Sequence, residues 1–298
     1  MSLILKNVSK SFVGKKAVDN ISLELTKPGV YGLLGTNGAG KTTTIRMILG
    51  ILKKDDGLIT WNGKEVNRKS VNFGYLPEER GVYPKIKIYD QLMYFAELKG
   101  MDRKSADKSI NKWAKELKVE EYLQMNPEKL SKGNQQKIQF ISAIIHEPKL
   151  LILDEPFSGL DPLNVELFKK IILELKEKGT SIIFSSHRLD HVEYFCEKLV
   201  ILVKGKSVLN GYLSKIKKDY KKKNIIIKGN IKKDEISKLE GVIDIIKQKD
   251  EYIVKISDEK YVSSIFKYIS KYDNISKYCV EDASLDEIFV SIVGESYE

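Results

Sequence analysis

The segment that most constrains the fold is residues 35–42, a glycine-rich octapeptide with the sequence GTNGAGKT. It matches the pattern GxxxxGK[ST] and lies between an apolar run, residues 30–34, and a helix-forming run, residues 43–49. Glycines allow backbone N–H groups to curl around a phosphate, and the start of the following helix adds its positive dipole end. We therefore predict a phosphate-binding P-loop rather than a flexible glycine loop.

The P-loop pattern predicts a role for each of its residues. Lys41 should reach the β- and γ-phosphates of a nucleotide, and the Thr42 hydroxyl should ligate Mg²⁺. The remaining residues should surround the phosphates with backbone amides. The predicted nucleotide-binding residues are Gly35, Thr36, Asn37, Gly38, Ala39, Gly40, Lys41, Thr42 and Thr43.

Apolar runs elsewhere in the chain predict an α/β fold. Four of them lack polar alternation, which is typical of parallel strands that helices bury on both faces. They cover residues 30–34, 150–153, 181–184 and 199–202. Residues 3–9 and 21–25 alternate instead and predict an antiparallel sheet exposed on one side. Helical periodicity dominates residues 86–145. We expect a P-loop NTPase core with an antiparallel β subdomain and a helical insertion, over residues 1–213.

Residues 214–298 predict a second, smaller domain. Residues 214–223 hold six lysines and one aspartate, and predict a solvated linker. The elements that follow have the order βαββαβ, which is typical of a small ferredoxin-like α+β unit. We expect strands at 223–228, 242–247, 252–256 and 275–280, and helices at 233–239, 260–270 and 284–293.

Two carboxylates follow the apolar run 150–153, at a strand end where open α/β sheets place their ligands. We predict that Asp154 holds the Mg²⁺ shell through water and that Glu155 orients and polarises the attacking water. Helix capping is the alternative for such a pair, and the upstream P-loop disfavours it.

One histidine lies at a comparable strand end. His187 follows the run 181–186, where its imidazole could contact both the γ-phosphate and the catalytic carboxylate. Read in isolation, it would be interpreted as a surface-loop histidine. That reading is given to the other two histidines of the chain, His146 and His191.

A second helix start, residues 130–137, has the sequence LSKGNQQK. Ser131 and the amide of Gly133 would form another anion-binding site, although a plain N-cap explains them equally well. The order of the segments along the chain decides between these readings. That order is the P-loop, residues 130–134, Asp154–Glu155, residues 158–161 and His187.

In this order the segments resemble the nucleotide-binding subunit of an ABC transporter. The family signature, usually LSGGQ, reads LSKGN here and includes Ser131, Lys132, Gly133 and Asn134. The D-loop falls on Ser158, Gly159, Leu160 and Asp161. Phe12 falls where an aromatic ring stacks on adenine, with a core phenylalanine as the alternative. The resemblance covers about the first 213 residues.

The resemblance implies a mechanism. Two chains would form a homodimer on ATP binding, with ATP and Mg²⁺ held by the P-loop and Asp154 of one chain and by Ser131 and Gly133 of the other. Glu155, His187 and Lys41 would be the catalytic residues, acting by positioning and charge stabilisation. The partners would be integral-membrane permease subunits on separate chains, so the protein would lie in the cytoplasm at the inner face of the cell membrane.

Two positions depart from the family pattern. Glu78, in the segment GYLPEER, falls where the family has a glutamine that touches Mg²⁺ and couples to the permease. A carboxylate could still ligate Mg²⁺, so the predicted metal ligands are Thr42, Glu78 and Asp154, with altered metal or pH dependence. In the signature, Lys132 and Asn134 replace a glycine and a glutamine. Ser131 and Gly133 remain, so we expect competent sites.

The end of the chain resembles a subgroup of the family. Residues 281–289, EDASLDEIF, are similar to the C-terminal extension of ABC-2-type exporter ATPases, which include a sodium- and drug-efflux group. That resemblance implies an exporter, with residues 214–298 as a dimer-stabilising or regulatory domain, or one that senses substrate.

Composition narrows the alternatives. The net charge is +10, of which residues 214–298 carry only +1, and a nucleotide-handling domain beside a membrane accounts for this excess without a nucleic-acid partner. No apolar run or N-terminal pattern predicts a membrane span or a secretory signal. Cys196 and Cys279 form no metal or disulfide pattern. Non-transport ABC ATPases usually carry a second cassette or a long coiled coil, and this sequence shows neither. Glu155 and His187 argue against a regulatory module that binds ATP without hydrolysing it.

Overall fold

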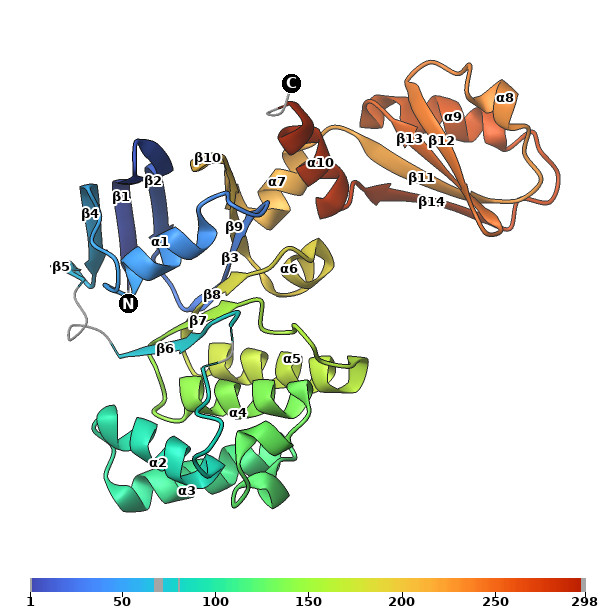
Figure 1. Cartoon of the computed structure of the whole chain (residues 1–298). Coiled ribbons are helices and arrows are strands. Elements are labelled where there is room, and N and C mark those ends of the chain that lie inside the picture. Colours follow the sequence, from blue (N-terminus) through green and yellow to red (C-terminus); the bar gives the residue numbers. More distant parts are fainter. Residues whose placement is uncertain (1, 67–71, 80, 296–298) are drawn as a thin grey trace. The chain divides into compact units, whose positions relative to one another are not determined.

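The chain divides into two units in the computed structural model, which describes residues 2–66, 72–79 and 81–295. The first unit is Met1–Gly211 and the second is Tyr212–Glu298 (Figure 1). The sequence analysis placed this division between residues 213 and 214, two residues later.

A six-stranded sheet with the order β10-β9-β3-β8-β7-β6 forms the centre of the first unit. Neighbours from β9 to β6 pair in parallel. The strands are β3 (Gly29–Gly35), β6 (Phe73–Leu76), β7 (Leu150–Asp154), β8 (Ser181–Ser185), β9 (Lys198–Val203) and β10 (Lys206–Tyr212). Every residue of β3, β7 and β8 is buried, as the uninterrupted apolar runs predicted. The edge strand β6 was not predicted.

A separate antiparallel sheet has the order β2-β1-β4-β5. Its strands are β1 (Leu3–Phe12), β2 (Lys15–Leu25), β4 (Asp56–Trp61) and β5 (Lys64–Glu65). Helix α1 (Lys41–Ile48) shares one core with both sheets, because its Ile45 and Ile48 cluster with Leu5 of β1 and Ile183 of β8. The predicted antiparallel sheet is therefore confirmed, and its buried face packs on α1.

The opposite face of the six-stranded sheet is covered by helices joined through aromatic contacts. Phe184 follows Ile183 in β8 and so points the other way. Its ring lies 5.6 Å from that of Phe157, and the ring of Phe140 stacks at 4.5 Å on that of Phe168. The helices on this side are α4 (Lys132–Ile144), α5 (Pro162–Glu177) and α6 (Leu189–Phe195). Figure 1 shows α1 and α4 on opposite sides of the sheet.

The predicted helical insertion at residues 86–145 is confirmed. It contains α2 (Ile88–Leu98), α3 (Arg103–Glu116), two 3₁₀ turns (Glu120–Tyr122 and Pro127–Lys129) and α4. Gly74 of β6 allows α4 to approach the sheet edge, because a Cβ there would lie 2.1 Å from the carbonyl oxygen of Ala143. This contact joins the insertion to the strand next to β7.

The second unit is built on an antiparallel sheet with the order β12-β13-β11-β14. Its strands are β11 (Lys223–Lys228), β12 (Val242–Gln248), β13 (Glu251–Ile256) and β14 (Lys277–Asp282). Its helices are α7 (Leu213–Asp219), α8 (Lys233–Ile236), α9 (Val262–Ile269), α10 (Leu285–Glu295) and a 3₁₀ turn (Glu259–Tyr261). The predicted βαββαβ order is confirmed.

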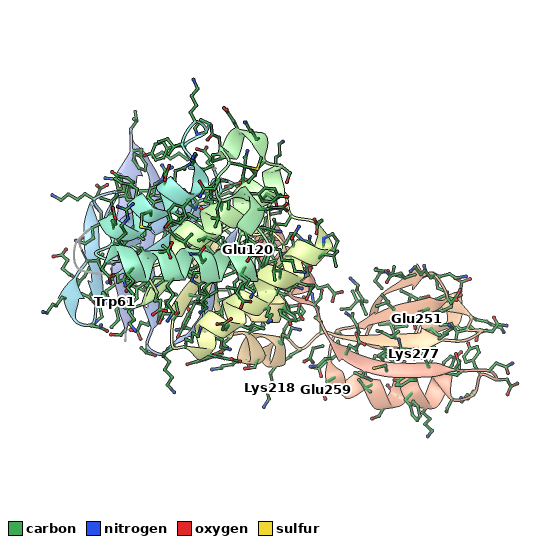
Figure 2. The ribbon with its side chains drawn as sticks, turned by 90° about the horizontal axis from the view of Figure 1, so that it is seen from below. Trp61, Glu120, Lys218, Glu251, Glu259 and Lys277 are labelled. Carbon is green, nitrogen blue, oxygen red and sulfur yellow. The ribbon has the colours of Figure 1, made fainter. Side chains whose placement is uncertain are left out.

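Three details of the second unit differ from the prediction or add to it. Helix α8 ends at Ile236 rather than residue 239. The predicted linker 214–223 is wrong in part, because α7 occupies its first half and buries Leu213 and Ile216. Across β11, Lys277 and Glu251 form an ion pair of 2.9 Å between the two neighbouring strands (Figure 2).

No helix within residues 2–66, 72–79 and 81–295 combines the length and apolar character that crossing a bilayer requires.

Candidate functional site

The P-loop connects β3 to α1 and depends on glycine at two close approaches. Gly40 precedes α1 with a φ of 102°, and a Cβ on it would lie 2.4 Å from the carbonyl oxygen of Ala17. Gly35 has a φ of 150°, and its Cβ would lie 2.4 Å from the carbonyl oxygen of Leu202. A side chain at either position would displace the backbone, so the loop can approach its neighbours only with glycine.

Inside this loop, Lys41 folds back over the carbonyl groups. Its Nζ donates to the carbonyl oxygens of Gly35 at 2.7 Å and Thr36 at 3.2 Å. Burial lowers the pKa of Lys41, and the charges of Glu155 and Asp154 oppose that change. In the first turn of α1, the Thr44 hydroxyl donates to the carbonyl oxygen of Gly40 at 2.9 Å.

The rest of the loop is open to solvent in the part that would meet a ligand. Asn37 and Gly38 are exposed, Thr36, Thr42 and Thr43 are half-buried, and Ala39 is buried. The Ala39 amide closes a turn onto the carbonyl oxygen of Thr36 at 3.1 Å. Anion binding by the backbone amides of this segment and of the start of α1 stays a prediction.

Asp154 and Glu155 lie at the carboxyl end of β7, next to β8. Asp154 is only 2% exposed. Burial raises the pKa of its carboxyl to about 6, and the charges of Glu78 and Glu155 act in the same direction, whereas Lys41 lowers it. Glu155 has a φ of 49°, in the left-handed region where a side chain other than glycine is uncommon. An uncommon backbone conformation at a strand end often marks a functional residue.

The carboxylate of Glu155 is held by the segment after β8. The backbone N–H of His187 donates to its Oε1 at 2.6 Å, and the Nδ1 of His187 lies 2.7 Å from the same oxygen. The Ser186 hydroxyl donates to Oε2 at 3.1 Å. The structure thus places His187 against Glu155, and its side chain is 70% exposed toward solvent.

Glu78 follows β6 and is exposed. Its charge acts on both Lys41 and Asp154, so the structure brings the three groups close enough to interact. Burial raises the pKa of Tyr75 to about 12, with Asp154 and Glu78 adding to the effect. Arg80, the last residue of the predicted segment, lies outside the described residues.

The predicted signature starts α4. Ser131 caps this helix, and its hydroxyl accepts the Asn134 amide at 3.3 Å. Both Ser131 and Lys132 are exposed. The structure brings this helix start next to the predicted D-loop, because a Cβ on Gly133 would lie 3.4 Å from the carbonyl oxygen of Gly159.

The predicted D-loop leads into α5. Asp161 caps that helix by accepting the Asn164 amide at 2.9 Å, and this bond holds the pKa of Asp161 below its usual value. Ser158 and Gly159 are exposed, and Leu160 is half-buried. Phe12 lies at the end of β1, 47% exposed, with the Lys10 ammonium 5.5 Å from its ring centroid. Its position is therefore not that of a core phenylalanine.

Comparison with known proteins identifies the family of the chain. Residues 18–158 match the family described as ABC transporter. A relative from Bacillus subtilis (strain 168), described as uncharacterized ABC transporter ATP-binding protein YhaQ, is 48% identical over 297 residues, covering 99% of this chain and 100% of the relative. The chain belongs to the ABC transporter ATP-binding proteins.

Other matches refine the place of this ABC cassette. Residues 211–293 match the C-terminal domain described as ATP-binding protein DrrA1-3-like, which confirms the resemblance of the tail to that exporter group. The lipopolysaccharide export system ATP-binding protein LptB of Haemophilus influenzae is 30% identical over 232 residues, 76% of this chain and 96% of that protein. A solved structure of an ATP binding subunit of an ABC transporter is 30% identical, with a TM-score of 0.69 over 74% of this chain and 93% of that one. The predicted fold is confirmed, and the cassette is an ABC-type ATPase.

Sequence reasoning missed or misread several residues of this ABC cassette. Ser186 was not predicted to touch Glu155, although the polar pair at residues 185–186 after an apolar strand was a usable signal. The surface-loop reading of His146 and His191 is wrong, because they are only 8% and 5% exposed. The pKa of His146 falls to about 4 through burial, and its Nε2 lies 2.8 Å from the carbonyl oxygen of Phe73.

Proposed function

We propose that two copies of this ABC cassette close around two molecules of ATP with Mg²⁺, and that hydrolysis drives an integral-membrane permease carried on separate chains. The observation that carries the proposal is the position of Glu155. Its carboxylate follows Asp154 at a buried strand end, its charge acts on the P-loop Lys41, and it contacts His187. This arrangement supports a role for Glu155 in activating a water beside bound phosphates.

Glu155 and His187 would divide the work at the γ-phosphate. Glu155 would accept the proton of the attacking water. The His187 ring would contact Glu155 through Nδ1, which lies 2.7 Å from Oε1, and a phosphate oxygen through Nε2. Lys41, held by two loop carbonyls, would turn to the phosphates when they arrive. Charge stabilisation by prepositioned groups supplies most of the rate in such reactions.

The side chains at this edge fit a magnesium ion. Thr42, Asp154 and Glu78 supply the oxygen ligands that Mg²⁺ prefers, and the ion commonly completes its shell with water and nucleotide phosphates. Among residues 2–66, 72–79 and 81–295, no group of three His, Cys, Asp or Glu side chains forms a self-contained metal site. When bound, Mg²⁺ would neutralise negative charge on the phosphates. Asp154 and Thr42 would hold the coordination shell of the ion, and Lys41 would supply the positive charge that comes from the protein.

The two-copy arrangement is supported by the separation of the site halves. The P-loop opens α1 on one side of the central sheet, and Ser131 opens α4 on the other side (Figure 1). Ser131, Ser158 and Gly159 are exposed, and Leu163 at the start of α5 is 85% exposed. A second copy would supply Ser131 and Gly133 to the phosphate and would cover Leu163.

A permease contact is supported by an apolar cavity of about 400 Å³ between β6, α2 and α4. Phe73, Tyr75 and Phe95 line it, and the exposed Ile51 and Leu98 line its wall. Tyr83, Ile86 and Tyr94 are further exposed apolar side chains of the neighbouring segment. Such a concentration of exposed apolar surface usually marks a protein contact. We propose that it receives a cytoplasmic helix of the permease, so the cassette would lie at the inner face of the membrane.

Outward transport is the direction that the relatives support. One relative is described as part of an export system, and the second unit is similar to the DrrA-like domain. The transported substrate would be selected by the permease. No nucleic acid is needed as a partner.

Phosphate release and sedimentation test this function together. Wild-type protein should release phosphate from Mg-ATP, and Glu155→Gln should lose about 10²–10⁴-fold in kcat while accumulating an ATP-bound dimer. Glu166→Gln, which alters an exposed glutamate paired with Lys169 in α5, is the matched control and should behave like wild type. A Glu155→Gln protein that stays monomeric with ATP, or that hydrolyses it normally, would contradict the proposal. Leu98→Arg should retain ATPase activity but lose co-purification with the permease.

A further inference from the structure

The carboxylate of Glu155 has two oxygen atoms that are held in different ways. Oε1 accepts two bonds from His187, one from its backbone N–H at 2.6 Å and one involving its ring Nδ1 at 2.7 Å. Oε2 accepts the Ser186 hydroxyl at 3.1 Å. The two His187 bonds converge on one atom, so they permit the carboxylate to pivot about Oε1. The bond to Oε2 fixes its plane.

The direction of the Ser186 hydroxyl is set by a neighbour. The backbone N–H of Arg188 donates to the Ser186 Oγ at 3.1 Å and occupies one of its lone pairs. Ser186 is 2% exposed, so bulk water does not compete for its single proton. A serine hydroxyl has one proton to donate. That proton therefore points to Glu155.

The starting point of the Glu155 side chain is also fixed. The Glu155 amide donates to the carbonyl oxygen of Ser185 at 2.9 Å, and its φ of 49° aims the side chain back toward the segment after β8. With the backbone set at one end and Oε1 held at the other, a pivot of the carboxylate about Oε1 is the freedom that remains. Ser186 contacts Oε2, the atom that this pivot moves.

We propose that Ser186 is a positioning residue for hydrolysis, which orients the Glu155 carboxylate so that one oxygen faces the attacking water. The inference rests on the proposed role of Glu155 as the group that activates water. Ser186 does not touch the nucleotide in this role. It acts through Glu155, and its loss should slow the chemical step while ATP binding and ATP-dependent dimerisation persist.

A purely structural role for Ser186 makes a different prediction. Its contact with Arg188 could serve only to shape the segment that carries His187. Loss of the hydroxyl would then disturb nucleotide affinity and protein stability together with the rate. A separate measurement of kcat and of KM for ATP distinguishes the two roles.

The test uses the full chain and compares Ser186→Ala with Ser186→Thr. Hydrogen bonds to charged groups are among the stronger ones in proteins, so Ser186→Ala should lower kcat by about tenfold with KM for ATP within twofold of wild type. Ser186→Thr keeps the hydroxyl and should restore at least half of kcat. Ser109→Ala is the matched control, because it removes a half-buried hydroxyl that donates to the carbonyl oxygen of Ile145 at 2.7 Å in the helical insertion. It should leave kcat unchanged.

Three results would overturn the inference. They are a kcat within twofold of wild type in Ser186→Ala, equal losses in the alanine and threonine variants, and a KM that rises as far as kcat falls. A double-mutant cycle adds an independent check, because Ser186→Ala should cause no further loss in a Glu155→Gln background. If Glu155→Gln itself keeps full activity, the proposed function fails. If only the Ser186 variants behave like wild type, the proposed function stands and this inference fails.

Discussion

The two units of the chain both hold carboxylates in place, but they do so in opposite electrostatic regimes. In the first unit, burial raises the pKa of Asp154 to about 6, and its neighbours include the carboxylates of Glu78 and Glu155. In the second unit, bonds from Lys232, Tyr272 and Tyr268 lower the pKa of Glu235 to about 2. Asp154 is thus destabilised as an anion in the absence of ligand, whereas Glu235 is stabilised.

This difference distinguishes a ligand-binding site, around Asp154 in the first unit, from a structural carboxylate, Glu235 in the second. A cluster of acidic groups around one lysine costs folding free energy and needs cations to relieve it, which Mg²⁺ and the P-loop lysine can provide. A carboxylate with three donors needs no ligand. The comparison predicts that substitutions in the first unit change activity and in some cases improve stability, whereas substitutions in the second change stability alone.

Among the substitutions that compare the two units, the largest effect is expected from Lys41→Ala. Lys41 is the cation that the three acidic residues face, and its removal should cost about 10²–10³-fold in kcat with a large loss of nucleotide affinity. Phosphate release and binding of a fluorescent ATP analogue measure the two effects. Lys54→Ala, which removes a half-buried lysine paired with the exposed Glu65 at 2.9 Å, is the control. Unchanged nucleotide affinity in Lys41→Ala would place the site elsewhere.

Asp154→Asn should separate activity from stability. A pKa raised from 3.8 to about 6 means that the folded state holds the proton more tightly than the unfolded state does. The ionised carboxylate therefore lowers the free energy of unfolding as pH rises from about 4 to about 6. Below about pH 4 it has no such effect. At pH 7 this cost is on the order of 2–3 kcal/mol. We expect Asp154→Asn to lose ATPase activity and to raise the free energy of unfolding of the ligand-free protein by up to that amount.

The pH dependence and a control check the sign of this effect. The gain from Asp154→Asn should disappear as pH falls from about 6 to about 4 in urea titrations. Asp55 in the same unit has a pKa lowered by the bond from Lys10, so Asp55→Asn should lose stability slightly instead. If both variants lose stability at pH 7, the contrast between the buried and paired carboxylates is wrong.

The residues that the sequence alone could predict are those whose chemistry leaves few alternatives. Gly35 and Gly40 meet neighbouring carbonyl oxygens at distances that exclude a Cβ, so the glycine pattern itself records the loop geometry. Asp154 lies at the end of an apolar strand, where a charged residue indicates either a functional group or a helix cap. The alternating and uninterrupted apolar runs likewise predicted part of each sheet of the first unit, namely strands β1, β2, β3, β7, β8 and β9.

Residues that depend on tertiary contacts could not be predicted in this way. Strand β6 is short and contains Gly74, whose reason lies in the approach of α4 rather than in local preference. His146 is buried because it meets the carbonyl oxygen of Phe73, which is 73 residues away in the chain. Helix α7 forms within a lysine-rich run because it buries the side chains of Leu213 and Ile216. None of these contacts leaves a local sequence signature.

Glu78→Gln should have an intermediate effect, because Glu78 is exposed and lies at the margin of the acidic cluster. Removal of its charge takes away one contribution that raises the pKa of Asp154, so the acid limb of activity should move to lower pH. Loss of a carboxylate ligand should raise the Mg²⁺ concentration for half-maximal activity severalfold, with kcat at saturating Mg²⁺ nearly preserved. Glu79→Gln, next to it and also exposed, is the control. An unchanged metal and pH dependence in Glu78→Gln would exclude Glu78 from the site.

The smallest effect on activity, and the sharpest test of the comparison, is expected from Glu235→Gln. Tyr268 and Tyr272 each donate to Glu235 Oε2 at 2.9 Å, and Lys232 reaches Oε1 at 2.9 Å. Because the pKa of Glu235 falls from 4.5 to about 2, its contribution to stability is present above pH 4.5 and is lost between that pH and about 2.

Glu235→Gln should therefore lower the thermal midpoint of the second unit slightly at pH 7 and not at pH 2. Burial and the bond to Glu235 both raise the pKa of Tyr272, so its alkaline titration, followed by ultraviolet absorbance, should move toward the normal value in the variant. Glu240→Gln removes a carboxylate that accepts the Tyr261 hydroxyl at a longer distance, 3.2 Å, and should change less. ATPase activity should stay within twofold in both variants. A larger loss of ATPase activity in Glu235→Gln would show that the second unit influences the nucleotide site. The distinction between a functional site in the first unit and a structural carboxylate in the second would then be wrong.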